Sequence, residues 1–202
     1  MLKLLISFAV LLFTAGCGPR YVDYFPYHDD GRSKPAVALF PLEDKSGHPV
    51  LLDLSQVVTE RIRYDIMSSG ELYLLSIEEI ESSSAQPERL PLFERFPDTD
   101  FVVNCELIRA ESVPFEAVPF QNKGLVIDYP CDTQLTFYVR LKVLDIRSRS
   151  PRVVLQEILT TSFLLPLDST GRNDLGSPLW RAEQRLADGI AKRLEQVIRS
   201  AY

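Results

Sequence analysis

The alternation of apolar and polar residues is most regular between Leu135 and Asp145. Every second residue from Leu135 to Val143 is Leu, Phe or Val, and the residues between them are Thr, Tyr, Arg and Lys. A period of two puts these two sets on opposite faces of a β-strand, so one face is expected in the core and the other in water. Residues 147–152 are predicted to form a turn, after which Val153–Ser162 returns as the partner strand.

Three further segments have strand patterns. Ala36–Phe40 is a continuous apolar run ended by Pro41, which is typical of a buried strand, and Leu72–Leu75 is predicted to be another. Residues 101–108 alternate, with Asn104 and Glu106 on one face and an apolar set on the other. The segment 110–130 contains three prolines and is predicted to be a long loop with extended edges. The apolar set on the alternating strand is Phe101, Val103, Cys105 and Leu107.

Two long segments have the spacing of amphipathic helices. The first is predicted to start at Asp53 as N-cap, with Gln56 as its capping-box partner, and to stop at Gly70. The second is predicted to start with Ser177 as cap and Pro178 in the first turn, and to run to the C-terminus. Their apolar stripes are Leu54, Val57, Val58, Ile62 and Ile66 in the first helix, and Leu179, Ala182, Leu186, Ile190, Leu194, Val197 and Ala201 in the second.

These elements together define a fold class. Ile77–Ile80 is predicted to be a short helix, and residues 82–98 are predicted to be a polar surface excursion with one turn around Leu92 and Phe93. Strands with one-sided patterning need a layer of helices to cover their apolar face. We therefore predict an α/β (α+β) fold, a two-layer sandwich with two main amphipathic helices on one face of a mixed four- to five-stranded sheet.

The N-terminus has the layout of an export signal. Lys3 is followed by an apolar run from Leu4 to Phe13, which is too short for a membrane-spanning helix of roughly 20 residues. The segment Phe13–Cys17 resembles a bacterial lipobox. That resemblance implies cleavage before Cys17, a diacylglyceryl group on its thiol and an acyl chain such as palmitate on the new amino group. Two or more acyl chains make membrane attachment persistent.

The predicted organisation is a lipoprotein signal peptide over 1–16, a lipidated tether over 17–34 and a single α/β domain over 35–202. The tether is proline-marked and rich in aromatic residues, and we expect it to dock partly on the domain. Gly18 follows the cysteine that the lipobox resemblance marks for lipidation. In lipoproteins of the enterobacterial kind this residue favours sorting to the outer membrane over retention in the inner membrane. We therefore expect the protein to be lipid-anchored in the outer membrane and to face the periplasm.

Composition excludes several classes of protein. The chain of 202 residues is 46% hydrophobic and 25% charged, which is ordinary for a globular protein. Its net charge of −6 becomes −7 when Lys3 is removed with the signal peptide, so a nucleic-acid partner is not expected. Two histidines and three cysteines provide little material for a metal site, and we predict no cofactor beyond the diacylglycerol and N-acyl chain at Cys17.

No catalytic motif is evident. The sequence has no phosphate-binding glycine loop, no Gly-x-Ser-x-Gly and no His-Glu-x-x-His. His48 lies near Asp44 and Ser46 in a Gly/Pro segment, and we interpret the three as parts of a turn. The protein is therefore predicted not to be an enzyme.

The two remaining cysteines would share an oxidising compartment after export. If the strands at 101–108 and 135–145 form a hairpin centred near residue 120, Cys105 lies opposite Leu135. Cys131 is then about 13 Å further along, beyond the separation of about 7 Å between Cα atoms that a disulfide tolerates. We expect Cys105 to be a buried thiol, although a shift of register or a bulge in 110–130 would change this geometry.

A basic cluster is the main candidate for ligand or partner contact. Arg147, Arg149 and Arg152 gather at the predicted turn, and Arg140 and Lys142 lie on the wet face of the preceding strand, directed toward it. Several guanidinium groups could hold phosphate or carboxylate, such as that of an anionic glycolipid. Alternatively, the same charges form a solvated hairpin tip that protects an edge.

Four segments resemble small envelope lipoproteins of the LptE-like and LpoB/CsgG-like kinds. Lys34–Gly47 is similar to their opening strand and loop, and Asp100–Leu107 to their next strand. Val143–Arg147 and Arg181–Ala191 complete the pattern, which covers nearly the whole mature chain as patterned hydrophobicity.

The two resemblances imply different partners. LptE-like proteins help a β-barrel translocon to place lipopolysaccharide in the outer membrane, and Val113–Phe115 favours this family. LpoB-like proteins activate a peptidoglycan synthase and CsgG-like ones form secretion pores; the excursion at 76–98 suits the LpoB-like kind better. Both resemblances imply a non-enzymatic, lipid-anchored adaptor in envelope assembly. Its expected partners are the membrane, one of these envelope proteins and, for the LptE-like kind, lipopolysaccharide.

Overall fold

The computed structural model describes residues 22–48, 54–85, 90–114, 121–122, 125–126, 131–166 and 176–202. The predicted signal peptide, the lipobox with Cys17 and the predicted N-cap Asp53 lie outside these ranges.

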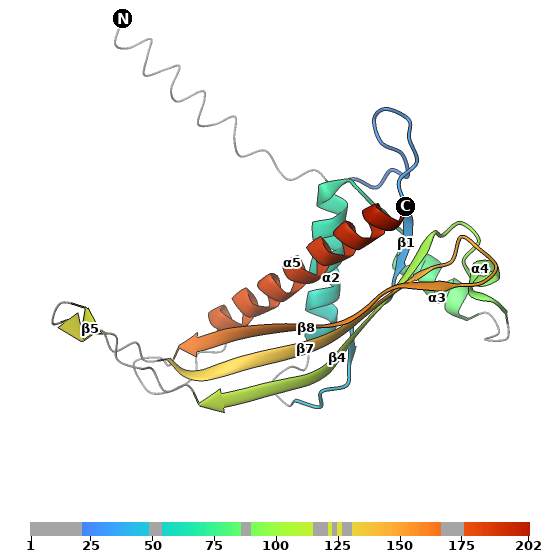
Figure 1. Ribbon diagram of the computed structural model, residues 1–202. Helices are drawn as coiled ribbons and strands as arrows, with labels where there is room; N and C mark the ends of the chain where they lie inside the picture. The colour runs from blue at the N-terminus through green and yellow to red at the C-terminus, as the bar shows by residue number, and fades with distance from the viewer. Residues whose placement is uncertain are drawn as a thin grey trace, which may run out of the picture.

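One mixed six-stranded sheet organises the chain (Figure 1). Its strands follow the order β3-β1-β4-β7-β8, and β2 pairs with β4 beyond the end of β1. A separate pair, β5 (Gln121–Asn122) and β6 (Leu125–Val126), lies outside this sheet. The strands of the main sheet are β1 (Ala36–Leu39), β2 (Glu43–Asp44), β3 (Tyr73–Leu74), β4 (Phe101–Pro114), β7 (Cys131–Asp145) and β8 (Arg152–Pro166).

Strand β4 separates the parallel part of the sheet from the antiparallel part. On one side β4 pairs with β1 in parallel, with Val37 opposite Phe101, and β1 pairs in parallel with β3. On the other side β4, β7 and β8 are antiparallel. Parallel strands are usually covered on both faces, which agrees with the continuous apolar sequence of β1. The predicted mixed sheet is therefore confirmed.

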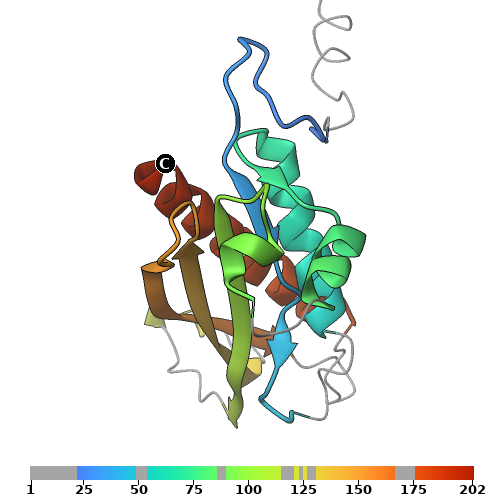
Figure 2. The same cartoon turned by 90° about the vertical axis from the view of Figure 1, so that its right-hand side faces the viewer.

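Two long helices cover one face of the sheet, as predicted (Figures 1 and 2). They are α2 (Leu54–Ser69) and α5 (Gly176–Ala201), which pack against each other and against the sheet. Within the described ranges, neither these nor the shorter helices combine the length and apolarity that a membrane span needs. The core below them contains the inward-facing residues of β4 and β7 and the apolar stripes of the helices.

A second, smaller core lies on the other face at one end of the sheet. Helices α3 (Ile77–Ser84) and α4 (Leu92–Arg95) cover Ala38 and Val102 there, and Phe96 is buried among them. Ser76 and Glu79 form a capping box that starts α3, with bonds of 3.2 and 2.6 Å. The segment 82–98 is thus more than a surface excursion, because Phe96 closes this second core.

The C-terminal end and the buried face of α2 agree with the sequence prediction, with one exception. Gly70 has a φ of +70°, the left-handed conformation that glycine adopts readily after the last helical residue. Val57, predicted to be in the apolar stripe, is 39% exposed. Thr59 is buried instead, because its hydroxyl donates to Ser55 O at 2.6 Å and accepts from Leu42 N at 2.8 Å.

Helix α5 differs slightly from its predicted start and stripe. It begins at Gly176, one residue before the predicted cap Ser177. Near its C-terminus Ile198 is fully buried and Val197 only partly, so the stripe shifts by one residue. A shift of this kind follows from the mismatch between the helical period of 3.6 and an integer spacing.

The predicted loop at 110–130 starts too early, and the strand predicted from Leu135 starts too late. Strand β4 continues to Pro114 and β7 begins at Cys131. The pairing of β4 with β7 shifts between Leu107 and Arg109, so Ile108 is an extra residue in a β-bulge. The bulge reverses the phase of the alternation, and Arg109 and Glu111 follow it on the outer face. A single alternating pattern therefore ends at Ile108 although the strand does not.

The register of this hairpin also changes the cysteine geometry. Cys105 pairs with Leu141, not with Leu135. Cys131 is ten residues from Leu141 along β7, roughly 33 Å at the usual rise of a strand. Cys105 is a buried free thiol, as predicted.

A substitution at Phe137 tests how much the main core contributes to stability. Its side chain is fully buried and its ring lies 5.7 Å from that of Phe163. Phe137→Ala should lower the free energy of unfolding by about 3–5 kcal/mol, because it removes buried apolar area and leaves a cavity. Val113→Ala is the control, since Val113 is 53% exposed on β4, and should cost less than about 0.5 kcal/mol. Urea unfolding followed by circular dichroism measures both, and equal losses would contradict this description of the core.

Candidate functional site

The structure separates the five predicted basic residues into two groups. Arg140 and Lys142 lie in the middle of β7 on the face that α2 and α5 leave open. Arg147 and Arg149 lie in the turn between β7 and β8, and Arg152 begins β8. The two residues on β7 line a hollow on that face, whereas Arg147 lines a separate hollow, so the structure does not show one cluster of all five.

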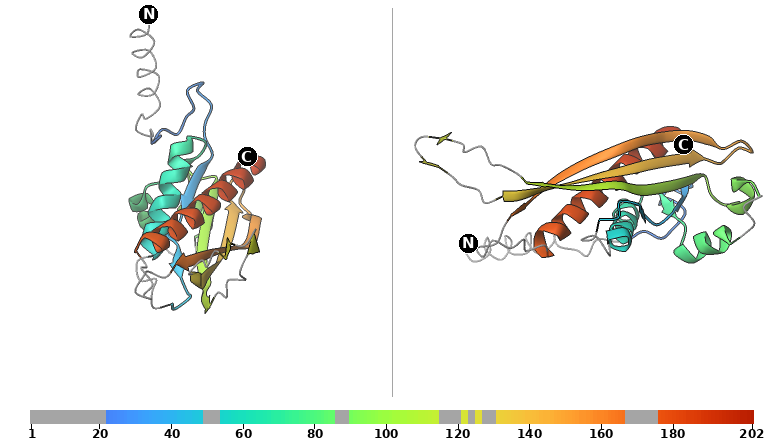
Figure 3. Two further views of the ribbon diagram at one scale, coloured as in Figure 1. Left: turned by 90° about the vertical axis from the view of Figure 1, so that its left-hand side faces the viewer. Right: turned by 90° about the horizontal axis from the view of Figure 1, so that it is seen from below.

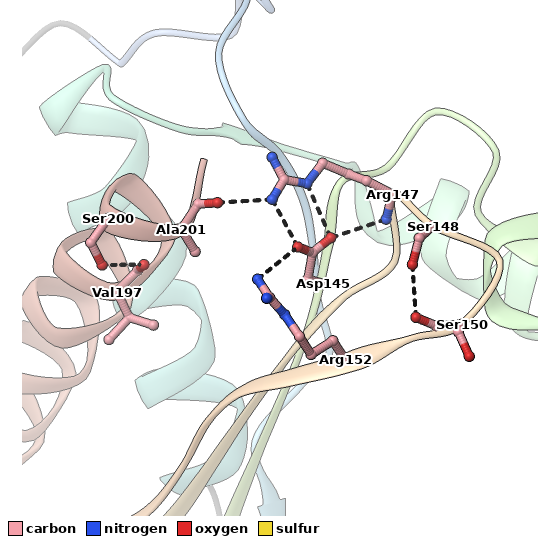
Figure 4. Close-up of polar contacts among 8 residues, drawn as sticks. All are labelled: Asp145, Arg147, Ser148, Ser150, Arg152, Val197, Ser200 and Ala201. Atoms are coloured by element: carbon pink, nitrogen blue, oxygen red, sulfur yellow. Dashed lines mark hydrogen bonds and ion pairs between the residues drawn. The ribbon is translucent and has the colours of Figure 1, made fainter.

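Arg147 is held by the protein itself (Figure 4). Its guanidinium donates two hydrogen bonds to the Asp145 carboxylate, at 3.0 and 2.8 Å, and one to Ala201 O at 2.8 Å. Its Cζ also lies 5.0 Å from the ring centre of Phe101 and 5.4 Å from that of Tyr202. Arg147 therefore fastens the β7–β8 turn to the C-terminal end of α5.

Asp145 is the anion on which this contact depends. Its side chain is only 12% exposed, and the hydrogen bonds from Arg147 hold the pKa of the carboxyl below its ordinary value. Arg152 lies 3.7 Å from the same carboxylate but is 72% exposed. Arg149 is exposed and makes no ion pair within the described part of the chain. Arg149 and Arg152 are thus the members of the turn that present charge to solvent.

The open face of the sheet has its own charge network. Glu106 accepts from Lys45 at 2.7 Å and from Arg140 at 2.8 Å, and Lys45 in particular lowers the pKa of Glu106. Lys142 lies in a cross-strand row between Asn104 and Gln156. These residues line a shallow hollow in which, among the residues described, Lys142 is the cation without an ion-pair partner.

The end of the predicted tether is folded onto the domain. Residues 23–34 form a hairpin, which we call the N-terminal hairpin, with Tyr27 and Ser33 paired. Asp23 N donates to Met67 O of α2 at 3.0 Å. The Lys34 ammonium, only 1% exposed, lies 2.6 Å from the Asp23 carboxylate and lowers the pKa of that acid. Partial docking of the tether, expected from the sequence, is what the structure shows.

Several segments distant in sequence meet at this end of the molecule (Figure 2). We call it the N-terminal hairpin end and define it by the N-terminal hairpin, the turn 146–151 and Tyr202. The Ser33 and Tyr202 hydroxyls lie 3.0 Å apart, and a hollow lined by Tyr27, Arg147 and Tyr202 joins the three parts. Large aromatic side chains stay exposed on the hairpin, by 60 to 68%, and these are Tyr24, Phe25 and Tyr27. The sequence shows that this segment is rich in aromatic residues, but it does not show which of them are exposed.

The residues near His48 form a turn, as interpreted. The Asp44 carboxylate accepts from the Ser46 backbone and hydroxyl at 2.8 and 2.7 Å, and Ser46 Oγ accepts from His48 N. Burial raises the pKa of the Cys105 thiol to about 12, which makes it unreactive as a nucleophile. Within the ranges that the structure describes, no group of three metal-ligating side chains comes together.

Comparison with known proteins supports the fold and gives no activity. A family model described as "Family of unknown function (DUF7499)" matches residues 23–202. No curated protein matches the chain at a significant level. Among solved structures, the hypothetical protein CT253 from Chlamydia trachomatis is 20% identical, with a TM-score of 0.54 over 82% of this chain and 98% of that one. At this identity the similarity shows a shared fold.

Weaker similarities extend to further bacterial proteins. Protein XCC0632 from Xanthomonas campestris is 10% identical, with a TM-score of 0.48 over 90% of this chain and 94% of that one. Lipoprotein GNA1162 from Neisseria meningitidis is 9% identical, with a TM-score of 0.45 over 80% and 99%. Bacterial lipoproteins are thus among the structures that the chain resembles at the level of a small α/β fold.

The Asp145–Arg147 contact predicts a pH-dependent stability. Asp145→Asn should lower the free energy of unfolding at pH 7 by about 1–3 kcal/mol, the contribution of hydrogen bonds to a charged group. Because the native carboxyl has a lowered pKa, the unfolded chain binds more protons near its ordinary value of 3.8. The wild type therefore loses this stability as pH falls through the native pKa, and the gap to the variant should close there.

Denaturant unfolding between pH 7 and pH 3 measures this gap. Asp98→Asn, at an exposed position of the same end, is the matched control and should follow the wild type throughout. A gap for Asp145→Asn that stayed constant with pH would show that the charge of Asp145 does not contribute.

Proposed function

The chain belongs to the DUF7499 family of unknown function, and we propose that it is a lipid-anchored, non-enzymatic adaptor in bacterial envelope assembly. The observation that carries the proposal is the short distance between the lipobox cysteine and the folded domain. Asp23 is the sixth residue after Cys17, and its backbone N–H is already hydrogen-bonded to α2. A chain of six residues spans at most about 20 Å, so acyl chains on Cys17 would hold the N-terminal hairpin end next to the bilayer.

The N-terminal hairpin end has exposed side chains that suit a position next to a bilayer. Tyr24, Phe25 and Tyr27 are exposed there, and tyrosine is enriched at the boundary between a bilayer and water. Arg149 and Arg152 lie at the same end and can contact phosphate groups. These groups support an LptE-like role in which the protein contacts lipopolysaccharide or its β-barrel translocon at the outer membrane, facing the periplasm.

A second candidate uses a different surface. The hollow around Lys142 and Arg140 lies on the open face of the sheet, away from the turn. A partner that binds this face would suit an LpoB-like regulator of a peptidoglycan synthase or a CsgG-like secretion component. The two candidates therefore differ in the residues that they use.

The distribution of the protein between membrane and soluble fractions tests lipidation. Cys17→Ala should release the protein from membranes, because the remaining chain lacks the acyl groups that make attachment persistent. Cys105→Ala is the matched control and should leave the protein in the membrane fraction. Quantitative immunoblotting after separation of inner membrane, outer membrane and soluble fractions gives the result, and unchanged fractionation of Cys17→Ala would refute the anchor.

The partner is tested by co-purification from detergent-solubilised membranes. We expect a β-barrel protein to co-purify, and we expect its yield to fall for Arg149→Ala/Arg152→Ala. Arg185→Ala/Lys192→Ala removes two exposed charges from α5 and should have no effect. Recovery of a peptidoglycan synthase, lost in Arg140→Ala/Lys142→Ala, would establish the second candidate instead. Recovery of no envelope protein with the lipidated chain would exclude both.

A further inference from the structure

The last strand of the sheet has an open edge. Strand β8 comes at the end of the strand order and pairs only with β7, over 15 residues (Figure 3). At the opposite edge β3 has only two residues. Among the described residues, no backbone hydrogen bond from a turn or loop reaches β8. Half of the backbone donors and acceptors along a strand of roughly 50 Å therefore face outward.

This edge has few of the features by which proteins normally prevent pairing with another strand. Between Val153 and Leu165 the strand contains no proline and no lysine, and its only charged residue is Glu157. Arg193 of α5 neutralises Glu157 through two bonds of 2.7 and 2.8 Å. Ile158 and Leu164 are 54% and 47% exposed on the open face. A long, apolar and uncharged edge is a template for strand addition.

Bulges define which part of the edge is regular. Leu144 pairs with Val153 and Val143 with Leu155, so Val154 is an extra residue at one end of β8. From Leu155 to Leu165 the pairing with β7 runs without interruption. Thr160 is the middle residue of this stretch.

We infer that β8 pairs antiparallel with β8 of a second copy of this chain, centred on Thr160. Around that centre Thr160 faces itself, Ile158 faces Ser162, and Glu157 faces Phe163. The single carboxylate of the stretch therefore never meets its own copy, and the threonine pair is a favourable cross-strand contact. The regular stretch of 11 residues is about 36 Å long, and at a depth of about 10 Å it covers roughly 360 Å² per copy, which is small for a specific contact, so main-chain hydrogen bonds would supply most of the affinity.

Pairing between copies joins two sheets into one continuous sheet. The helices α2 and α5 of both copies then lie on the same face, and the open faces merge on the other. This inference concerns β8 alone and does not depend on the lipid anchor or on the partner proposed above.

Cysteine cross-linking in native membranes tests the pairing with the full chain. Thr160→Cys places two thiols opposite each other across the two-fold axis, and oxidation should give a covalent dimer on a non-reducing gel. Val113→Cys is the matched control, because Val113 is likewise exposed on the open face but lies on β4, outside the proposed β8 contact. It should cross-link at least about tenfold less, the ratio that 1.4 kcal/mol of specific pairing produces.

The second variant places a positive charge on the edge of β8 to weaken the proposed pairing. Ile158→Lys places an ammonium next to Ser162 of the other copy, and in the Thr160→Cys background it should lower the dimer yield about tenfold. Val113→Lys in the same background should not. Equal cross-linking of Thr160→Cys and Val113→Cys, or a cross-link of Thr160→Cys to a different protein, would overturn the inference, as would a dimer yield unaffected by Ile158→Lys.

Discussion

The fold depends on β4, which pairs with neighbouring strands of opposite orientation on its two sides. Its first residues pair in parallel with β1, and its whole length pairs antiparallel with β7. At its start both faces are buried, by α2 and α5 on one side and by the α3–α4 segment on the other. Further along only one face is covered. The strand therefore joins a two-sided α/β core to a one-sided antiparallel sheet.

The sequence predicted the elements whose periodicity is uninterrupted. The alternation of β7, the apolar run of β1 and the stripes of α2 and α5 each have a single phase, and the sequence places each of these elements to within a few residues. A bulge breaks that condition. At Ile108 one extra residue exchanges the inner and outer faces of β4, so the pattern after it looks like a loop although pairing continues to Thr133. Long-range register, which sets the distance from Cys105 to Cys131, could not be read from either strand alone.

In the candidate site, too, features local in the sequence could be predicted, whereas contacts between distant segments could not. The sequence identified Arg147, Arg149 and Arg152 as a cluster, which is correct for their position in one turn. It could not show that the C-terminus of α5 returns to that turn and accepts a hydrogen bond from Arg147. The role of a charged residue depends on which carboxylates and carbonyls the fold brings to it. Arg147 is consequently part of the framework, and the exposed arginines beside it provide the accessible charge.

The contact between the N-terminal hairpin and α2 has a mechanical consequence. The Lys34 and Asp23 side chains close the hairpin at its base, and Lys34 precedes β1 by two residues. A pull on the N-terminus is therefore resisted first by this buried ion pair and the Asp23–Met67 hydrogen bond. Beyond them the load reaches β1, which is hydrogen-bonded on both sides in the parallel part of the sheet. Force exerted through the chain at this point is thus transmitted to the centre of the fold, without a slack segment to absorb it.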